Sequence, residues 1–367
     1  MTEIKALYCS NKRNKQRFTT VLVIALIISA FIALCISTRF VSPMTVLNCF
    51  GHAILPSIFD IGSRTDYVIF TRIVSPRVLI AILTGFSLGL TGAVMQSVLR
   101  NPLVSPFTLG LSSAAGFGAS LMIVIGPIMF AGLYNSSFMI ANEYITGSSI
   151  LLVISAFICG LASMCMVLLL CRTKHMSQSV VILAGVIIGY LFQAGITTLK
   201  YISNDSVLRE ITIWLMGGMW STSWSSDIIL LPIVLLGSIW VISQAKTFNV
   251  MGGGDDVAQT LGIDVKRFRS RSLIIVTLIS SACIAFTGII GFVGLMAPHI
   301  CRMLIGNDHR FLLPASGFMG AIILLISDTV ARTILLPQEL PVGVIMYILG
   351  GCFFIYLISK KKGRNLE

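Results

Sequence analysis

Long stretches without a charged residue recur along the chain, and short segments rich in lysine and arginine separate them. The stretches show no period-two alternation of apolar and polar residues, so we expect helices and not the strands of a barrel. About 20 apolar residues are enough for a helix to cross the hydrocarbon of a bilayer. We therefore predict ten helical spans, near residues 19–38, 78–99, 108–129, 148–170, 180–200, 226–244, 272–287, 289–305, 313–334 and 342–359.

Two of the apolar stretches need more than one element each. Residues 103–142 are too long for one span and contain Pro106 and Pro127, so we expect a re-entrant entry followed by a single span. Residues 272–301 fit a full span and the start of a short one, with a turn near Thr287 and Gly288. The first stretch lacks a small-residue cleavage site and nine more follow it, which argues against a cleaved signal peptide.

The composition supports a membrane protein. Hydrophobic residues make up 56% of the chain and charged residues only 11%, and the mean hydropathy is +0.95. These values exclude a soluble domain and predict an all-α integral membrane protein. We expect a basic N-terminal segment at residues 1–18, a single ten-span domain at 19–360 and a short tail at 361–367.

The distribution of basic residues predicts the orientation. Most of the 26 lysines and arginines fall at the chain ends and in alternate loops, which places both termini in the cytoplasm. This bias accounts for the net charge of +12, and the basic residues would face anionic lipid headgroups. We therefore expect no nucleic-acid partner. The basic residues that do not follow the bias are Arg39, Arg64, Arg72, Arg77, Lys200, Arg209 and Arg332.

The chain offers few groups for catalysis or metal binding. Its nine cysteines include no CxxC motif and its four histidines are scattered, so we expect no catalytic residues, no cofactor and no metal site. A GxxxxGK[ST] loop for ATP is absent. Asp328 is the one carboxylate set in an apolar stretch, and we expect it to pair with Arg332 one turn further on instead of carrying ions across the membrane. A transporter of this kind would take its energy from a partner.

The segment 246–271, "KTFNVMGGGDDVAQTLGIDVKRFRSR", predicts a helix–Gly–helix insertion between two spans. Three glycines break the preceding helix, and Asp255 and Asp256 then stand where an N-cap and a first-turn acid favour the start of a new helix. Gly262 is placed to end that helix. The segment is either an ordinary solvated basic loop or a compact knob that docks a cytosolic motor, and we favour the knob.

A second pattern concerns helix packing. The segment "TGFSLGLTGAVMQ" places Gly85, Gly89 and Gly92 at helical spacings of four and three. Small residues on one face allow helices to approach closely in lipid. We therefore expect this helix to pack tightly against its neighbours through its glycines.

Several segments together resemble one known family. "GGGDDVAQTLGIDV" looks like the coupling loop of the permeases of type II ABC importers, the FecCD-type family for vitamin B12, haem and iron–siderophore complexes. In the same order, "SPRVLIAILTGFSLGLTGAVMQSVLRNPLVSPFTLGLSSAAGFGASL", "WLMGGMWSTSW", "GFVGLMAPHICR", "DHRFLLPASGFMGA", "DTVAR" and "ELPVG" are similar to further parts of that family. The resemblance covers roughly residues 70–360, and the ordered combination of fragments is highly specific.

The resemblance implies a ten-span permease that works as a homodimer in the plasma (inner) membrane, without an ATPase site of its own. It implies two kinds of partner, a cytosolic ABC ATPase dimer and an extracytoplasmic substrate-binding protein. The residues implied in ATPase coupling are Asp255, Asp256, Ala258, Leu261, Gly262, His309 and Arg310. Arginines that dock the binding protein would be Arg72, Arg77 and Arg332, of which Arg72 is displaced from the Arg-x-Pro-Arg pattern of the family. The translocation path, lined by 180–200 and 205–217, would present Gln193, Thr197, Thr198, Tyr201 and Asn204.

The expected substrate is an iron chelate, such as a siderophore complex or haem, or cobalamin. The same architecture could import an oxyanion such as molybdate. A secondary transporter or channel is disfavoured, because ionisable residues near the bilayer midplane are missing. A membrane enzyme is disfavoured as well, because no span carries a clustered catalytic set.

Overall fold

Helices form most of the described chain. The computed structural model describes residues 2–36, 41–55, 58, 63–140, 143–172, 177–219 and 222–363. Within these ranges the helices of the first half are α1 (Thr2–Cys35), α2 (Pro43–Ile54), α3 (Arg64–Ile69), the π-helix η1 (Phe70–Val74), α4 (Ser75–Val98), α5 (Leu111–Met129), α6 (Ala131–Tyr134), α7 (Gly147–Arg172) and α8 (Gln178–Ile202). The helices of the second half are α9 (Asp205–Met216), α10 (Trp224–Ser243), α11 (Ala245–Gly252), α12 (Asp255–Thr260), α13 (Val265–Thr287), α14 (Val293–Ile305), α15 (His309–Thr333) and α16 (Val342–Gly363).

One small sheet interrupts the helices. Strands β1 (Ser137–Ile140) and β2 (Glu143–Thr146) pair antiparallel, with Ser137 opposite Thr146. The predicted all-α fold is thus confirmed except for this hairpin, which lies between the predicted spans 108–129 and 148–170 and was not predicted. The re-entrant entry predicted there is a non-helical segment, residues 101–110, that leads into α5.

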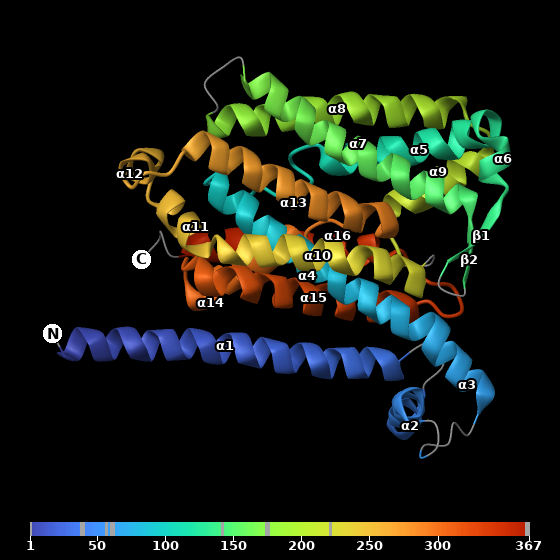
Figure 1. Cartoon of the computed structure of the whole chain (residues 1–367), viewed down its shortest axis with the longest axis horizontal. Coiled ribbons are helices and arrows are strands. Elements are labelled where there is room, and N and C mark those ends of the chain that lie inside the picture. The colour runs from blue at the N-terminus through green and yellow to red at the C-terminus, as the bar shows by residue number, and fades with distance from the viewer. Residues whose placement is uncertain are drawn as a thin grey trace.

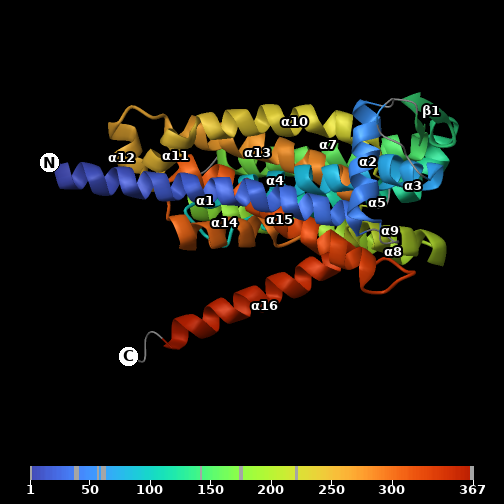
Figure 2. The same cartoon turned by 90° about the horizontal axis from the view of Figure 1, so that it is seen from below.

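The long helices lie side by side along the longest axis of the molecule (Figure 1). The described ends of the chain and α12 lie at one end of the bundle, here called the α12 end. Helices α2 and α3 and the β-hairpin lie at the opposite end, called the hairpin end. Seen from below, α16 leans away from the bundle on the side opposite α10 (Figure 2).

Nine helices of the described chain are long and apolar enough to cross a membrane, and α14 is a shorter apolar helix. Nine predicted spans therefore correspond to long helices and the tenth to α14. The predicted short span at 289–305 begins only at Val293, because residues 288–292 are not helical. Gly288 and Phe292 there have φ angles of 67° and 64°, outside the helical range.

The second span is longer than predicted. It runs without interruption from Arg64 to Val98, whereas the apolar pattern placed it at 78–99. Pro76 lacks an N–H group and usually starts a helix. Here the wide π turn η1 directly precedes it, so the helical path continues through the proline.

Helix α4 forms the centre of the bundle, and nearly all of its residues are buried. A Cβ atom added at Gly85 would lie 2.6 Å from the carbonyl oxygen of Gly320 on α15. Cβ atoms at Gly89 and Gly92 would collide with the carbonyl oxygens of Ser316 and Gly294. The predicted close packing through the glycine face is therefore confirmed, with α15 and α14 as the partners.

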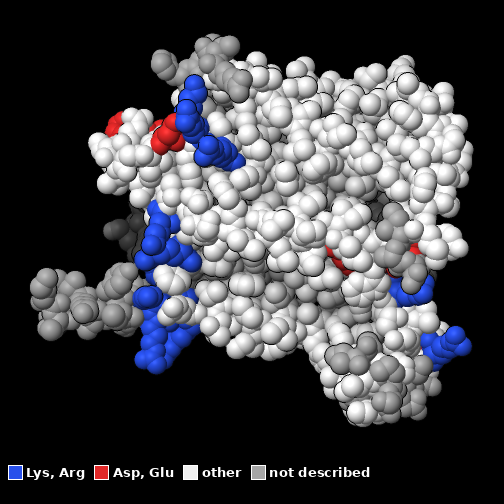
Figure 3. Space-filling view, viewed as in Figure 1, with Lys and Arg blue, Asp and Glu red and all other residues white. Residues whose placement is uncertain are grey.

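Charged side chains lie at the ends of the bundle. Lysine and arginine side chains gather mostly at the α12 end, a few lie at the hairpin end, and the broad middle of the face in Figure 3 is uncharged. This pattern agrees with helices that cross a bilayer along the long axis of the molecule.

Candidate functional site

The short helix α12 projects beyond the spans at the α12 end (Figure 1). Gly254, with a φ of 130°, stands directly before α12, and Gly262, with a φ of 81°, follows it. Asp264 then accepts a hydrogen bond from the backbone N–H of Arg267 at the start of α13. Both positive φ angles favour glycine, which explains why the segment folds as two helices joined by a sharp turn.

Asp255 attaches this short helix to the rest of the protein. Its Oδ1 atom lies 2.5 Å from Nη2 of Arg100, which follows α4, and its Oδ2 atom lies 2.9 Å from Nη2 of Arg269 on α13. The Arg100 Nε–H also donates to the carbonyl oxygen of Met251 at 3.2 Å. The side chain of Arg269 is only 3% exposed. The sequence places both arginines among the cytoplasmic basic residues, and it does not predict their pairing with Asp255, because that pairing depends on tertiary structure.

The predicted coupling residues of α12 divide into an inner and an outer set. Ala258 is buried against Met251 and Val265, so it supports the helix from inside. Leu261 is 65% exposed and Val257 is 46% exposed, on successive turns of the same helix. The outer surface of α12 therefore presents two apolar side chains, together with the exposed Asp256 and Gly262. Val257 was not predicted as a site residue.

His309 and Arg310 lie at the N-terminus of α15, beside α11. The backbone N–H of His309 and its ring Nδ1 both contact Oδ1 of Asn249, at 2.7 and 2.8 Å. The amide of Asn249 donates to Asp308 at 2.9 Å, and Arg310 contacts the same carboxylate at 2.6 Å. The Arg310 hydrogen bonds hold the pKa of Asp308 well below its usual range. His309 is buried, so of the two predicted residues only Arg310 reaches the surface.

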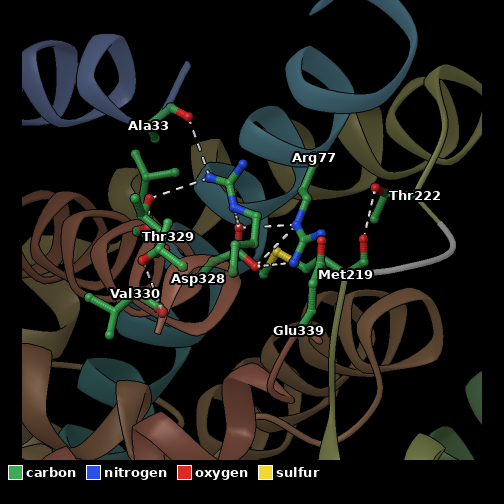
Figure 4. Close-up of polar contacts among 11 residues, drawn as sticks. Ala33, Arg77, Met219, Thr222, Asp328, Thr329, Val330 and Glu339 are labelled. Carbon is green, nitrogen blue, oxygen red and sulfur yellow. Dashed lines mark hydrogen bonds and ion pairs between the residues drawn. The ribbon is translucent and has the colours of Figure 1, made fainter. Parts of the chain in front are cut away.

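A cluster of four charged residues lies at the hairpin end (Figure 4). Arg77 on α4 contacts Asp328 on α15 at 2.9 Å and Glu339 in the following loop at 2.6 Å. Arg332 Nε lies 3.2 Å from Asp328 Oδ2, an ion-pair distance without the alignment of a hydrogen bond. Arg332 Nη2 also approaches the carbonyl oxygen of Ala33 on α1 at 3.4 Å. The predicted pairing of Asp328 with Arg332 is confirmed.

The three arginines predicted to dock a binding protein lie in different surroundings. Arg77 is 7% exposed and Arg332 is 2% exposed, and both guanidinium groups face carboxylates inside the protein. Arg72 is exposed on η1. Of the three, Arg72 is therefore the one whose charge is open to a partner in this structure.

The predicted path residues lie on α8 and at the start of α9. Gln193, Thr197, Thr198 and Tyr201 are exposed, and Tyr201 reaches 89%. The two threonine hydroxyls donate to carbonyl oxygens of their own helix. Asn204 caps α9 by accepting from the N–H of Val207 at 3.0 Å. This face of α8 is thus uncharged and only mildly polar, and within the described ranges no group of three metal-ligating side chains is present.

The sequence model of the FecCD transport family matches residues 25–360. The chain is 36% identical to the hemin transport system permease protein HmuU of Yersinia pestis, over 80% of this chain and 84% of that protein. It is 33% identical to the vitamin B12 import system permease protein BtuC of Vibrio vulnificus, over 95% of each. A solved inward-facing structure described as a metal-chelate type ABC transporter superposes with a TM-score of 0.79 at 28% identity, covering 94% of this chain and 99% of that one.

Proposed function

This chain belongs to the FecCD transport family and is a multi-pass ABC importer permease. We propose that it moves an iron chelate or cobalamin into the cytoplasm. A separate ATPase dimer supplies the energy, and an extracytoplasmic binding protein delivers the substrate. The substrate class rests on relatives that are named for hemin, for vitamin B12 and, in Bacillus subtilis, for Fe(3+)-citrate.

The observation that carries the proposal is the outer surface of α12. Val257 and Leu261 are exposed apolar side chains on a helix that Asp255 fixes to Arg100 and Arg269. A rigid knob with an apolar tip is suited to a shallow pocket on a partner, because burial of one leucine contributes about 1.5–3 kcal/mol. Motion of the ATPase subunits would then pass through Asp255 into α4 and α13.

The test is ATP hydrolysis and uptake by the reconstituted importer. Leu261→Gln should reduce substrate uptake and its coupling to hydrolysis about tenfold, since that loss corresponds to about 1.4 kcal/mol of contact. Gln259→Ala on the same helix is the matched control and should leave coupling unchanged. If the Leu261→Gln variant took up substrate at the rate of the unaltered importer, α12 would not be the coupling element.

The substrate is tested by uptake of radiolabelled haem, ferric siderophore and cobalamin in a strain that lacks the chain. The exposed face of α8 is uncharged and offers no chelating set, which suits a bulky substrate that is handed over intact. We expect one of these three compounds to depend on the chain. Uptake of molybdate in their place would identify an oxyanion importer of the same architecture.

The proposed assembly is a homodimer with the path between its two copies. Helices α8 and α16 support it: Tyr190, Leu191 and Tyr201 of α8 are 72%, 68% and 89% exposed, and α16 leans away from the bundle (Figure 2). Their exposed apolar side chains need either lipid or a second copy as a neighbour. Crosslinking between cysteines placed at Tyr201 of both copies tests the dimer, and a purely monomeric product would contradict it.

The proposed orientation places the α12 end in the cytoplasm and the hairpin end outside the plasma membrane. The basic side chains that gather at the α12 end support it (Figure 3). Lys12 lies in the N-terminal part of α1, and Lys266 and Arg267 lie in the first turn of α13, shortly after α12. Lys12→Cys and Lys266→Cys should react with a membrane-impermeant maleimide only in inverted vesicles, and Arg64→Cys only in intact cells. The unaltered chain, which has exposed Cys165 and Cys352, gives the background.

A further inference from the structure

Two adjoining hollows lie near the hairpin end, and the smaller one is partly lined by α9, which the family resemblance also places along the translocation path. The larger one, of about 620 Å³, is an apolar groove between α7 and α10 with α13 as its floor. The smaller one, of about 370 Å³, lies between α5, α7 and α9. They share Ser149, Leu152 and Trp214, so these three residues form the ridge between them.

The groove has the depth of one membrane leaflet. Its wall on α10 runs from the N-cap Ser223 to Ile233, ten steps along a helix, which rise about 15 Å. This is half of the roughly 30 Å of hydrocarbon in a bilayer. The edges of the groove carry Ile154 and Ile229, which are 48% and 45% exposed on lipid-facing surfaces of two spans. The groove therefore opens sideways into the hydrocarbon and not into water.

The lining changes from apolar to polar along the groove. Its deep part is formed by side chains such as Val153, Phe157 and Ile233, and its mouth by Thr146 and Ser223. None of its lining residues is charged. Such a surface fits an acyl chain below and the ester region of a lipid at the mouth.

The smaller hollow carries the charges that the groove lacks. Arg209 and Glu210 both line it, beside the hydroxyl groups of Tyr134, Ser148 and Ser206. Neither Arg209 nor Glu210 makes an ion pair with any residue in the described part of the chain. A guanidinium group and a carboxylate that line the same hollow are complementary to a headgroup that carries both a phosphate and an ammonium group.

We propose that the two hollows together bind one zwitterionic phospholipid from the leaflet at the hairpin end. Its acyl chain occupies the groove between α7 and α10, and its headgroup lies in the smaller hollow with the phosphate at Arg209 and the ammonium group at Glu210. Helix α16 leans from the opposite side of the bundle (Figure 2), so the groove is separate from one of the two faces proposed for the dimer.

Native mass spectrometry of the importer, extracted from membranes that contain phosphatidylethanolamine and phosphatidylglycerol, tests the proposal. We expect one phosphatidylethanolamine per permease chain to survive delipidation. Val153→Phe combined with Ile233→Phe fills the groove and should abolish the bound lipid. Ile158→Phe adds the same bulk to an exposed position of α7 outside the groove and should retain it. Arg209→Gln combined with Glu210→Gln should lower retention several-fold and remove the preference over phosphatidylglycerol.

The proposal would be overturned if the filled-groove variant retained as much phosphatidylethanolamine as the unaltered chain, or if the unaltered chain did not prefer it over phosphatidylglycerol. A detergent or protein bound in the groove in place of lipid would also overturn it. A second measurement does not depend on the folding of that variant. In a chain with Trp214 as its only tryptophan, fluorescence should be quenched by lipids brominated along the acyl chain. Absence of quenching in this otherwise unaltered groove would also overturn it.

Discussion

Arg77 on α4 and Asp328 on α15 form a buried ion pair at 2.9 Å although 251 positions separate them in the chain. Asp328 is fully buried and faces Arg332 as well, while Glu339 balances the second positive charge. The pair joins the same two helices that approach through Gly85 and Gly320. One polar contact and one glycine contact therefore fix α4 against α15 at different depths.

Asp328→Asn should destabilise the protein strongly. Removal of this carboxylate leaves two buried guanidinium groups with Glu339 as their one acidic partner among the described residues, and breaking a buried pair in this way costs about 3–5 kcal/mol. Unfolding in mixed detergent micelles measures the change. Asp256→Asn, at an exposed position, is the control and should lie within about 0.5 kcal/mol of the unaltered protein. Equal stability of the two variants would show that the cluster does not hold α4 to α15.

Arg72→Glu should weaken the affinity of the permease for its binding protein about fivefold at low salt, because an exposed charge pair contributes about 1 kcal/mol. The loss should shrink at high salt. Arg64→Glu, at the same end of the molecule, is the comparison. Arg77→Glu and Arg332→Glu should lower the yield of folded protein first, because both side chains are buried. If these two variants folded normally and lost only their affinity for the binding protein, Arg77 and Arg332 would be docking residues after all.

Asp255→Asn should loosen α12. Arg100 and the buried Arg269 would lose the carboxylate that each contacts, and the helix would be held mainly by Ala258. Hydrogen exchange of the backbone amides at 253–262 should accelerate, and ATP hydrolysis should become less dependent on substrate. The adjacent variant Asp256→Asn removes a charge that makes no ion pair within the described chain. Identical hydrogen-exchange rates in the two variants would show that Asp255 does not hold α12 to Arg100 and Arg269.

Gly85→Ala should cost about 1–3 kcal/mol, the usual range for overpacking a tight contact. The new methyl group would lie 2.6 Å from the Gly320 carbonyl oxygen and 2.7 Å from Cα of Ala321, and both are backbone atoms that cannot turn away. Gly252→Ala at the end of α11 meets nothing within 4 Å and should be neutral. Thermal unfolding of the two variants gives the comparison, and a neutral Gly85→Ala would show that α15 can shift without cost.

The sequence predicted those structural features that depend on residues close together in the chain. Apolar length located nine long helices, the spacing of Gly85, Gly89 and Gly92 identified a packing face, and the interval between Asp328 and Arg332 identified an ion pair within one helix. The glycine face and the ion pair depend on residues at most two helical turns apart, and the spans depend on one continuous stretch of sequence. The role of each coupling residue stays a prediction, because function needs partners that a single chain does not contain.

Contacts between residues far apart in the chain could not be predicted from the sequence. Nothing local indicates that Arg77 faces Asp328, or that Arg269 faces Asp255. The sequence therefore predicted Arg77 as a docking residue, from the family resemblance, and Arg269 only as one of the cytoplasmic basic residues. The β-hairpin was missed because its apolar residues continue the composition of the neighbouring spans. The late start of α14 was missed for a similar reason, since residues 289–292 are as apolar as a helix.

That late start has an electrostatic consequence. With 13 residues, α14 rises about 20 Å and cannot cross the roughly 30 Å of hydrocarbon. It ends at the α12 end, so its first turn lies inside the bilayer. The aligned peptide dipoles of a helix leave about half a positive elementary charge at this terminus. The permease therefore carries a fixed positive potential at intramembrane depth that comes from the backbone, and no change of pH can neutralise it.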